Sequence, residues 1–294
     1  MKYFRINIYL KIKYYFLTFF LNKKNLNYRI ENKIKKTSKK KYFIATSQLR
    51  VGFLVLLKYL KFKFPSKNEI IFSPYNLPEM INVSKNLKYK IKFCDLNYNN
   101  GFFKISDLKK KINKKTLAVV LTNMFNTYED TILIKNICKK RKVILIEDNA
   151  ISFDNYKTIK NKKVYTGSFG LYSLYSFNIM KNISALYGGG ISTNDIDFRK
   201  YATREIDKYL NFPSSLLIKQ SIIFLILKIL SIDFLYKKFF FKIVKYAHFK
   251  ENTFLLKIFY PSLKFKNKKF PKYYFTKISN ISTKLVYLQL SDLQ

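Results

Sequence analysis

The sequence predicts an α/β fold with a largely parallel sheet. Between residues 41 and 200, short β-rich runs alternate with stretches of helical apolar spacing, which is typical of consecutive βαβ units. One of these runs, KVILIEDNA (142–150), contains a continuous apolar strand, as expected for a strand buried on both faces of a sheet. Apolar residues make up 48% of the 294 residues, so the chain can bury the core that such a sheet requires.

The elements can be placed in order along the chain. Strands are expected at the β-rich runs 42–45, 69–72, 89–96, 117–125, 142–150 and 170–177. Helices are expected between them, at 47–62, 77–86, 105–113 and 130–140. Ser47 stands where it could cap the first of these helices.

The two flanks of this region have a different character. Residues 1–40 contain an aromatic, helix-like segment and then a basic, Asn-rich linker, and no stretch reads as a secretory signal. Residues 215–246 are strongly apolar, but Lys219, Lys228 and Asp233 interrupt them too often for a membrane-spanning helix, which needs about 20 apolar residues. We expect an amphipathic helical hairpin there, packed on the domain or lying on a membrane surface.

The chain is strongly basic, with 57 Lys and Arg against 17 Asp and Glu and a formal net charge of +40. Such a charge fits a protein that binds nucleic acid or an anionic membrane. The lysines are spread along the whole chain, and Lys, Asn, Ile, Phe and Tyr, all encoded by A/T-rich codons, are abundant together. We therefore interpret codon bias as the main cause and expect no specific nucleic-acid partner.

The cysteine and histidine content disfavours several kinds of catalytic site. Cys94 and Cys138 have no metal-ligand spacing, and we expect them to be core thiols in a reducing compartment such as the cytoplasm. A single histidine, His248, cannot form a histidine metal site. Zinc-hydrolase and serine-hydrolase chemistry are therefore disfavoured, and no metal site is expected.

Two places in the sequence could hold catalytic groups. Glu147 and Asp148 end a buried strand, and open α/β sheets bind ligands at the carboxyl ends of their strands. Lys181 lies further on, between the aromatic run and Gly188–Gly190. A lysine in an enclosed site has a lowered pKa and can form a Schiff base. Taken alone, the spacing also fits a polar loop after a strand and a surface lysine in a glycine-rich loop.

This set of residues fits the requirements of pyridoxal phosphate. The cofactor needs a lysine for the Schiff base, a carboxylate that keeps its pyridine nitrogen protonated, and hydroxyl and backbone N–H groups for its phosphate. Lys181, Asp148 and Ser176 would supply one of each. The glycines at 188–190 would let the backbone approach a planar cofactor closely.

The sequence around these residues resembles the DegT/StrS family of sugar aminotransferases. The family pattern is an acid pair that ends a strand, a G-x-x-G segment, then S-F-x-x-x-K-N and a glycine pair. The corresponding residues here are Glu147–Asp148, Gly167, Gly170, Ser176, Phe177, Lys181, Asn182 and Gly189–Gly190. The likeness is clearest over 146–194, covers about residues 41–200 and reappears at 274–292.

The resemblance implies a fold, a cofactor and a role for each site residue. The fold would be the large domain of a fold-type I pyridoxal-phosphate transferase, in a homodimer with each active site at the subunit interface. Lys181 would hold pyridoxal 5'-phosphate covalently and move the proton between the substrate carbon and the cofactor carbon. Asp148 would pair with the pyridine nitrogen, while Ser176 and Ser47 would bind the phosphate. Asn182 would be a further cofactor-binding residue.

The chain departs from the family pattern at several positions. Ile151 stands where members usually have Gln or His against the cofactor ring, and Tyr187 stands where an acid often precedes the glycine pair. The turn SQLR (47–50) replaces a small-residue turn, and its Arg50 is a loose match to an arginine of some members. NMFN (123–126) replaces a His-containing stretch. These changes bear on catalysis more than on cofactor binding.

The expected domain organisation follows from the same resemblance. We expect an N-terminal helical and basic segment at 1–40, the cofactor-binding α/β domain at 41–210 and an apolar helical insertion at 211–273. Residues 274–294 resemble the helix that precedes the family's C-terminal small domain. That domain is therefore expected to be incomplete and the chain to be C-terminally short.

Three functions are compatible with the sequence. The first is a pyridoxal-phosphate aminotransferase that converts a keto group of a nucleotide-linked sugar to an amine, with glutamate or a similar donor, for surface polysaccharide. The second is a family relative that binds the cofactor but no longer transaminates, because of its substitutions or its missing end. The third is a basic protein that binds nucleic acid or a membrane surface, with 215–246 as a peripheral membrane contact.

Overall fold

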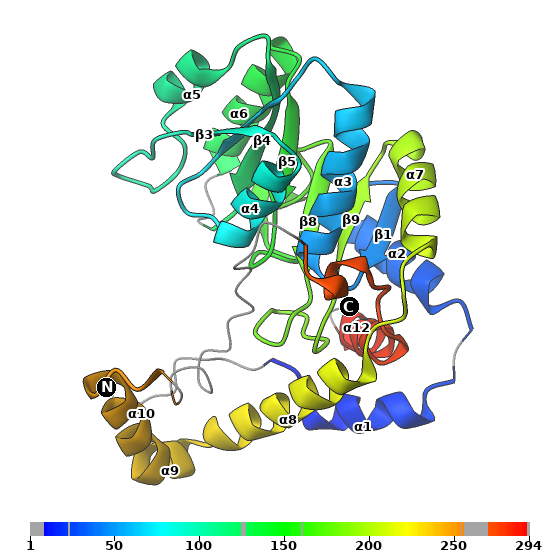
Figure 1. Cartoon of the computed structure of the whole chain (residues 1–294), viewed down its shortest axis with the longest axis vertical. Coiled ribbons are helices and arrows are strands. Elements are labelled where there is room, and N and C mark those ends of the chain that lie inside the picture. Colours follow the sequence, from blue (N-terminus) through cyan, green and yellow to red (C-terminus); the bar gives the residue numbers. More distant parts are fainter. Residues whose placement is uncertain are drawn as a thin grey trace.

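A computed structural model describes residues 9–22, 24–124, 128–159, 161–253, 255 and 270–292. Its centre is a seven-stranded sheet in the order β1-β9-β8-β5-β4-β2-β3 (Figure 1). These strands are β1 (Tyr42–Thr46), β2 (Glu69–Phe72), β3 (Lys90–Phe93), β4 (Thr116–Thr122), β5 (Ile144–Asp148), β8 (Tyr172–Ser176) and β9 (Gly189–Thr193). Strand β9 runs antiparallel to β1 and β8, whereas the other neighbouring pairs are parallel. The prediction of a largely parallel sheet is confirmed.

The helices between the strands follow the predicted order. They are α3 (Leu49–Lys63), α4 (Pro78–Asn86), α5 (Ile105–Lys111), α6 (Tyr128–Lys140) and α7 (Ile196–Asp207). A small separate sheet, β6 (Tyr156–Ile159) with β7 (Lys162–Tyr165), was not predicted. Its side chains are mostly exposed and its sequence is lysine-rich, so it lacks the apolar pattern that marks a core strand.

Helices cover both faces of the sheet. Side chains of α3, α4 and α7 form one core cluster with the side chains on one face of the sheet. On the opposite face, α2 (Leu26–Ser38) and α12 (Asn280–Asp292) form a second cluster, and α5 and α6 form a third. Cys94 and Cys138 are free thiols in the third cluster, as expected for core residues. The result is a three-layer arrangement with the sheet in the middle.

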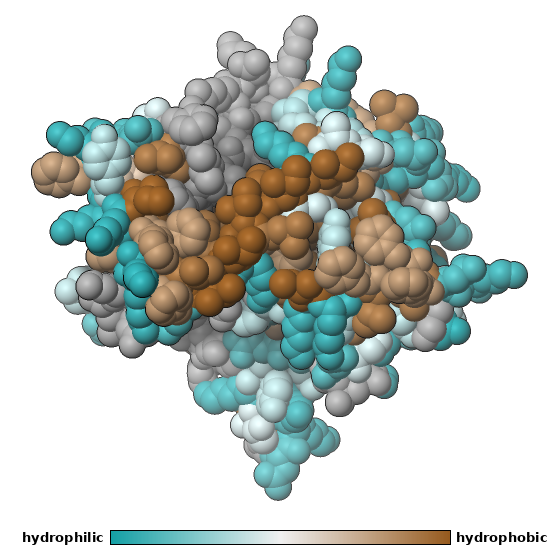
Figure 2. Space-filling view, turned by 90° about the horizontal axis from the view of Figure 1, so that it is seen from below, coloured by the Kyte–Doolittle hydropathy of each residue, from teal (hydrophilic) through white to brown (hydrophobic). Residues whose placement is uncertain are grey.

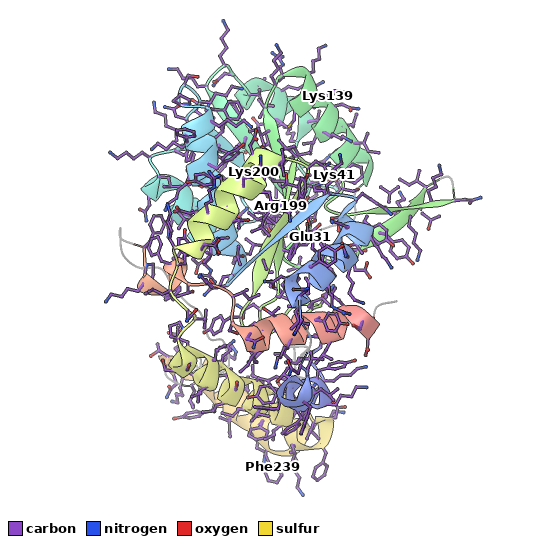
Figure 3. The ribbon with its side chains drawn as sticks, turned by 90° about the vertical axis from the view of Figure 1, so that its right-hand side faces the viewer. Glu31, Lys41, Lys139, Arg199, Lys200 and Phe239 are labelled. Carbon is purple, nitrogen blue, oxygen red and sulfur yellow. The ribbon has the colours of Figure 1, made fainter. Side chains whose placement is uncertain are left out.

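The N-terminal region differs from the expectation. The aromatic segment forms α1 (Ile12–Phe20), but the residues predicted as a basic linker form helix α2. Leu26, Ile30 and Ile34 recur every four residues and are buried, which is the apolar stripe that fixes this helix. Glu31 of α2 accepts a hydrogen bond from the Phe43 N–H at 3.3 Å and pairs with Arg199 of α7 at 3.7 Å, so the outer edge of β1 is covered (Figure 3).

The apolar segment after residue 213 is helical but does not form a hairpin. It contains α8 (Ser214–Leu230), α9 (Asp233–Leu235), a π-helical turn (Tyr236–Phe240) and α10 (Phe241–Phe249). The two helical rods meet at a 79° bend, so they form a corner and not an antiparallel pair. In the described part of the chain, no single helix is long and apolar enough to cross a membrane, although this bent pair passes that test when both rods are counted.

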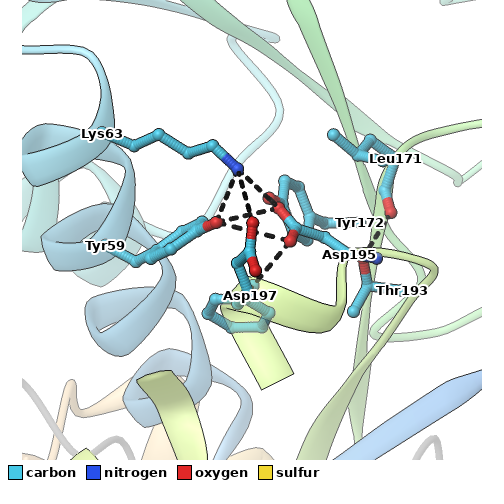
Figure 4. Close-up of polar contacts among 8 residues, drawn as sticks. Tyr59, Lys63, Leu171, Tyr172, Thr193, Asp195 and Asp197 are labelled. Atoms are coloured by element: carbon cyan, nitrogen blue, oxygen red, sulfur yellow. Dashed lines mark hydrogen bonds and ion pairs between the residues drawn. The ribbon is translucent and has the colours of Figure 1, made fainter. Parts of the chain in front are cut away.

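A polar network fixes α3 and α7 at one edge of the sheet (Figure 4). Asp195 caps α7 by accepting the Phe198 N–H at 3.0 Å, and it also accepts the Tyr172 hydroxyl at 2.7 Å. Tyr59 and Lys63 of α3 approach the same carboxylate, at 3.1 and 3.5 Å. Burial alone would raise the pKa of Asp195, but these hydrogen bonds and the Lys63 charge lower it. Because β9 is antiparallel, this edge is opposite to the one where β5 ends.

Candidate functional site

The strand ends that carry the predicted residues meet at one edge of the sheet. Strands β1, β5 and β8 run in the same direction, so their carboxyl ends lie together. In the register of the sheet, Gly189 of β9 pairs with Thr46 on one side and with Ser176 on the other. Asp148 pairs with Leu174, two residues before Ser176. The carboxylate, the serine and the turn at Ser47 are therefore within about three strand spacings of one another, roughly 15 Å.

Side-chain alternation places two of the candidates on the same face. Ile146 and Leu174 pack against α3 in the first core cluster. Side chains two residues apart on a strand share a face, so Asp148 and Ser176 also face α3. Asp148 is buried and Ser176 is half-buried. A ligand at this edge would therefore lie between the strand ends and the first turn of α3.

The turn before α3 contains buried polar groups without partners. Ser47 and Gln48 are both buried, and neither the Ser47 hydroxyl nor the Gln48 side-chain amide has a hydrogen-bond partner among the described residues. Leaving such groups unpaired costs about 1–3 kcal/mol each, which is unusual unless a ligand or water binds them. The prediction that Ser47 caps α3 is wrong, because the N-cap is Gln48 and it makes no side-chain cap.

Gly189 allows this turn to approach the sheet. A Cβ atom at Gly189 would lie 2.3 Å from the Leu49 nitrogen and 2.7 Å from the Gln48 carbonyl carbon. Any other residue would push the first turn of α3 away from β9. The first of the paired glycines therefore places the free N–H groups of a helix start, which favour anions, directly beside the strand ends.

Lys181 lies on the loop between β8 and β9. This loop closes on itself, because the Phe177 N–H donates to the Gly188 carbonyl at 2.9 Å and the Ala185 N–H donates to the Phe177 carbonyl at 2.8 Å. Helix α12 holds it from outside: the Ser184 N–H donates to Gln289 Oε1 at 3.0 Å, and Gln289 Nε2 donates to the Ser184 carbonyl at 2.7 Å. The loop that carries the lysine is thus fixed at both ends.

Asp148 and Lys181 influence each other electrostatically. Burial raises the pKa of Asp148 to about 6, although the Ala150 N–H and the charge of Lys181 act in the opposite direction. Burial lowers the pKa of Lys181; the charge of Asp148 opposes this shift and that of Arg50 adds to it. The structure thus brings together a carboxylate and an amine whose pKa values both move toward neutrality, a pattern typical of catalytic sites.

Glu147, next to Asp148, serves a different part of the structure. Its carboxylate accepts backbone N–H groups of the G-x-x-G segment: Gly167 at 2.9 Å, Phe169 at 2.8 Å and Gly170 at 2.6 Å. The buried Lys40 donates to the Gly167 carbonyl at 2.7 Å, and burial lowers the pKa of Lys40 to about 8. Glu147 therefore holds a loop on the face opposite α3 and does not face the candidate site.

The remaining sequence candidates have the following positions. Asn182 is exposed, and its Nδ2 donates to the Phe153 carbonyl at 3.4 Å. Ile151 is 46% exposed, after the end of β5. Tyr187 is buried and its ring packs against Phe212, with centroids 4.9 Å apart. Arg50 forms an ion pair with Glu79 at 3.6 Å.

Sequence reasoning did not select Gln48, Lys40 or Gln289. Gln48 differs from the small residue of the family turn, which could have marked it as a special position. Lys40 is indistinguishable by sequence among 57 basic residues. Gln289 lies 105 residues from its partner Ser184, and a local sequence pattern cannot predict a contact over such a separation.

The comparisons with known proteins identify the family of the chain. Residues 18–207 match the family model described as the DegT/DnrJ/EryC1/StrS aminotransferase family. This match covers more than half of the chain. The chain belongs to the DegT/DnrJ/EryC1/StrS family. The family expected from the residues around Lys181 is confirmed.

Two curated proteins match this DegT/DnrJ/EryC1/StrS chain at low identity. The GDP-perosamine synthase of Escherichia coli O157:H7 is 28% identical over 178 residues, which are 60% of this chain and 47% of that protein. The GDP-4-keto-6-deoxy-D-mannose 3-dehydratase of Escherichia coli O55:H7 is 27% identical over 169 residues, 56% of this chain and 42% of that protein. The chain thus spans less than half the length of these relatives.

A solved structure shares the fold of this DegT/DnrJ/EryC1/StrS chain. Helicobacter pylori PseC, described as an aminotransferase involved in the biosynthesis of pseudoaminic acid, superimposes with a TM-score of 0.57 at 23% sequence identity. The alignment covers 66% of this chain and 52% of PseC. The prediction of a fold-type I large domain is confirmed at the level of the fold.

Proposed function

We propose that this protein is a pyridoxal-phosphate-dependent sugar aminotransferase. The observation that carries the proposal is that buried Asp148 and Lys181 influence each other's pKa values at the strand ends, beside unpartnered polar groups at the start of α3. Family membership supports the same reaction class. The substrate would be a keto group on a nucleotide-linked sugar, the amino donor glutamate or a similar amine, and the product an amino sugar for surface polysaccharide.

The residues at the strand ends fit the cofactor. Ser47, Gln48 and Ser176 with the free N–H groups of the α3 start would bind the phosphate, and Arg50 adds positive charge nearby. Asp148 would pair with the pyridine nitrogen; a protonated ring there would favour the ionised carboxylate and lower its raised pKa again. Asn182 is the least supported member of the predicted set, since its amide contacts Phe153.

Lys181 is the residue that would act on the reacting atoms. Its lowered pKa leaves a larger share of the amine neutral at neutral pH, and a neutral amine can attack a carbonyl carbon. The same Nζ atom can then accept a proton from a carbon atom and return it to another. Bound pyridoxal phosphate would supply the electron sink for this chemistry.

Cofactor binding is tested by visible absorbance. Purified protein mixed with pyridoxal phosphate should show the band of a covalent lysine–cofactor adduct, and Lys181→Ala should lose it. Lys40→Met is the matched control, because Lys40 is also buried with a lowered pKa but faces the other side of the sheet. If Lys181→Ala keeps the band, the assignment of Lys181 is wrong.

The partners are part of the same proposal. We expect the protein to be a homodimer, in which the partner subunit would enclose Lys181 further. We also expect it to be located in the cytoplasm. Residues 274–294 would begin a C-terminal small domain, after an insertion at 211–273 that follows the cofactor domain at 41–210 and the N-terminal segment at 1–40. Sedimentation velocity at two protein concentrations separates a homodimer from a monomer.

A second candidate is a cofactor-binding relative that does not transaminate. It is favoured by Ile151, whose exposed aliphatic side chain stands where the family usually has a polar one, and by Tyr187, which is packed against Phe212. A half-reaction with glutamate separates the two functions, because only an active enzyme converts the bound cofactor to its amine form. A preserved absorbance band without conversion supports the second candidate.

A further inference from the structure

Helix α8 is apolar on two sides. One side, with Phe224, Leu227 and Leu230, is buried in the second core cluster, and the Phe224 ring lies 5.9 Å from the Tyr15 ring of α1. The other side exposes Ile218, Ile222, Leu225, Ile226 and Ile229. A helix that only packs on a domain needs one apolar stripe. The second stripe of α8 is left exposed by the part of the chain that the structure describes.

The exposed stripe belongs to a larger apolar face. Helix α1 lies beside α8 along one side of the molecule, and α10 continues from it (Figure 1). Exposed residues on these neighbours are Ile12, Phe16, Leu17, Phe19 and Phe20 of the α1 segment and Phe234, Phe239, Ile243, Tyr246 and Phe249 of the α9–α10 segment. Figure 2 views the molecule from this side and shows a band of apolar side chains across it. We call these residues, with the exposed stripe of α8, the apolar face.

Lysines flank the apolar face. Between residues 214 and 251 there are seven lysines and two acids: Lys219, Lys228, Lys237, Lys238, Lys242, Lys245 and Lys250 against Asp233 and Glu251. In the helical rod Asp233–Phe249, which ends with α10, the exposed lysines 238, 242 and 245 follow one another at spacings of four and three residues. Phe239, Ile243 and Tyr246 form the adjacent exposed stripe. Lys238 Nζ lies 5.3 Å from the Phe234 ring and 5.6 Å from the Phe239 ring.

We propose that the apolar face binds the surface of an anionic lipid bilayer, with α1, α8 and α10 lying in the plane of the interface. Apolar side chains would enter the acyl boundary, and the flanking lysines would reach the phosphate groups. Because the inner stripe of α8 stays packed on the domain, the helices lie on the membrane and do not cross it. A second copy of the chain fits less well, since it would bring two lysine-rich surfaces together in a protein of net charge +40.

The experiment measures binding of the full-length protein to sedimentable vesicles. Vesicles of phosphatidylcholine alone are compared with an equal mixture of phosphatidylcholine and phosphatidylglycerol, at low and high salt. Binding should require phosphatidylglycerol and weaken with salt, as electrostatic attraction is screened. Circular dichroism confirms that each variant below is folded.

Apolar variants test whether insertion contributes. Ile222→Glu with Phe239→Glu should lower the partition coefficient by about tenfold or more. The control pair is Phe62→Glu with Tyr98→Glu, which changes the charge equally at side chains that are 83% and 100% exposed but lie outside the apolar face. The control pair should lose much less binding.

Lysine variants test whether the position of the charge matters. Lys238→Glu, Lys242→Glu and Lys245→Glu should together lower binding by more than about a hundredfold, since losing each lysine near a membrane surface costs roughly fivefold and the new negative charge adds repulsion. Lys109→Glu, Lys110→Glu and Lys139→Glu are the control, since Figure 3 places Lys139 at the end of the molecule opposite to Phe239. Equal losses in both lysine sets would mean that net charge alone attracts the protein, and the proposal would fall.

One further outcome would show that the apolar face binds a second copy of the chain and not a bilayer. If Ile222→Glu with Phe239→Glu leaves vesicle binding unchanged but converts a dimer to a monomer in sedimentation velocity, the apolar face is an interface between two copies. Pyridoxal-phosphate uptake should be unaffected in all of these variants, so the result is independent of the proposed enzymatic function.

Discussion

At the scale of single residues, Glu147 and Asp148 are adjacent in sequence and separate in function. Alternation along β5 directs Glu147 to the loop at Gly167–Gly170 and Asp148 to the face of α3. The sequence identified both acids as candidates at a strand end. Only the sheet register and the packing of Ile146 show which one faces the site.

The raised pKa of Asp148 predicts a pH dependence of stability in the cofactor-free protein. Its pKa is about 6 in the folded state against 3.8 for an ordinary aspartate, so the folded state binds more protons between these values. The contribution of Asp148 to stability should therefore be complete below about pH 4 and be lost as the pH rises toward about 6. Asp148→Asn should remove this decline and raise the free energy of unfolding at pH 7 by about 3 kcal/mol.

Urea denaturation of the cofactor-free protein at pH 4 and pH 7 checks the Asp148 prediction. The two proteins should be alike at pH 4 and differ at pH 7. An Asp148→Asn variant that is less stable than the wild type at pH 7 would show that burial does not dominate at this carboxylate.

Replacing Gly189 should have a steric effect that replacing Gly188 lacks. In Gly189→Ala the new Cβ would lie 2.3 Å from the Leu49 nitrogen, which is backbone and cannot rotate away. We expect a loss of about 3 kcal/mol in stability and weaker pyridoxal-phosphate binding, because the start of α3 must shift. Gly188→Ala is the control: its closest contact would be the Phe177 Cβ at 3.2 Å, so thermal denaturation and absorbance titration should show a clearly smaller effect.

At the scale of elements, the strands and helices of the core were predictable because their apolar residues form continuous runs bounded by polar segments. The runs at β2, β4 and β5 are continuous apolar segments, and α3 is apolar and buried on nearly every side. Helix α2 was missed because its lysines and asparagines hide a stripe of only a few apolar residues. The corner between α8 and α10 was missed because an apolar pattern does not specify the angle between two helices.

The contact between helix α12 and the Lys181 loop predicts that a substitution in α12, outside the site, will loosen this loop. Gln289→Leu would leave the Ser184 N–H and carbonyl without their partners, at a cost of about 2 kcal/mol or more. The loop should then be cleaved faster by protease, and the affinity for pyridoxal phosphate should fall. Ser291→Ala is the control on the same helix, because the Ser291 hydroxyl contacts only the Tyr287 carbonyl among the described residues, at 2.9 Å.

Limited proteolysis and absorbance titration distinguish the outcomes for Gln289. Faster cleavage within 177–188 together with weaker cofactor binding is the expected result. Equal cleavage and equal affinity in Gln289→Leu and Ser291→Ala would mean that the loop is rigid without α12.

At the scale of the whole molecule, the charge of +40 predicts a stabilising effect of salt. Like charges spread over a compact protein repel one another, and added salt screens this repulsion. Raising sodium chloride from about 0.05 to about 0.5 M should raise Tm by roughly 2–4 °C, which corresponds to about 1 kcal/mol.

Differential scanning fluorimetry in sodium chloride measures the salt effect. Potassium chloride at the same ionic strength serves as the control, since screening depends on ionic strength and not on the identity of the cation. A Tm that falls with sodium chloride would mean that ion pairs such as Lys58–Glu205, at 2.8 Å, outweigh the repulsion.

The place of β9 in the sheet has a consequence for how the protein is made. Strand β1 is the first strand to be synthesised, but it pairs with β9. Tyr42 therefore cannot pair in the sheet until Thr193 has been synthesised. During synthesis the central parallel strands can associate while β1 has no neighbour, and closing so long a loop is slow. Ser47 and Gln48 are held beside Ser176 only after β9 has inserted between β1 and β8. The turn proposed to bind the phosphate is thus assembled late, and we expect the complete site to form only after residue 193 has left the ribosome.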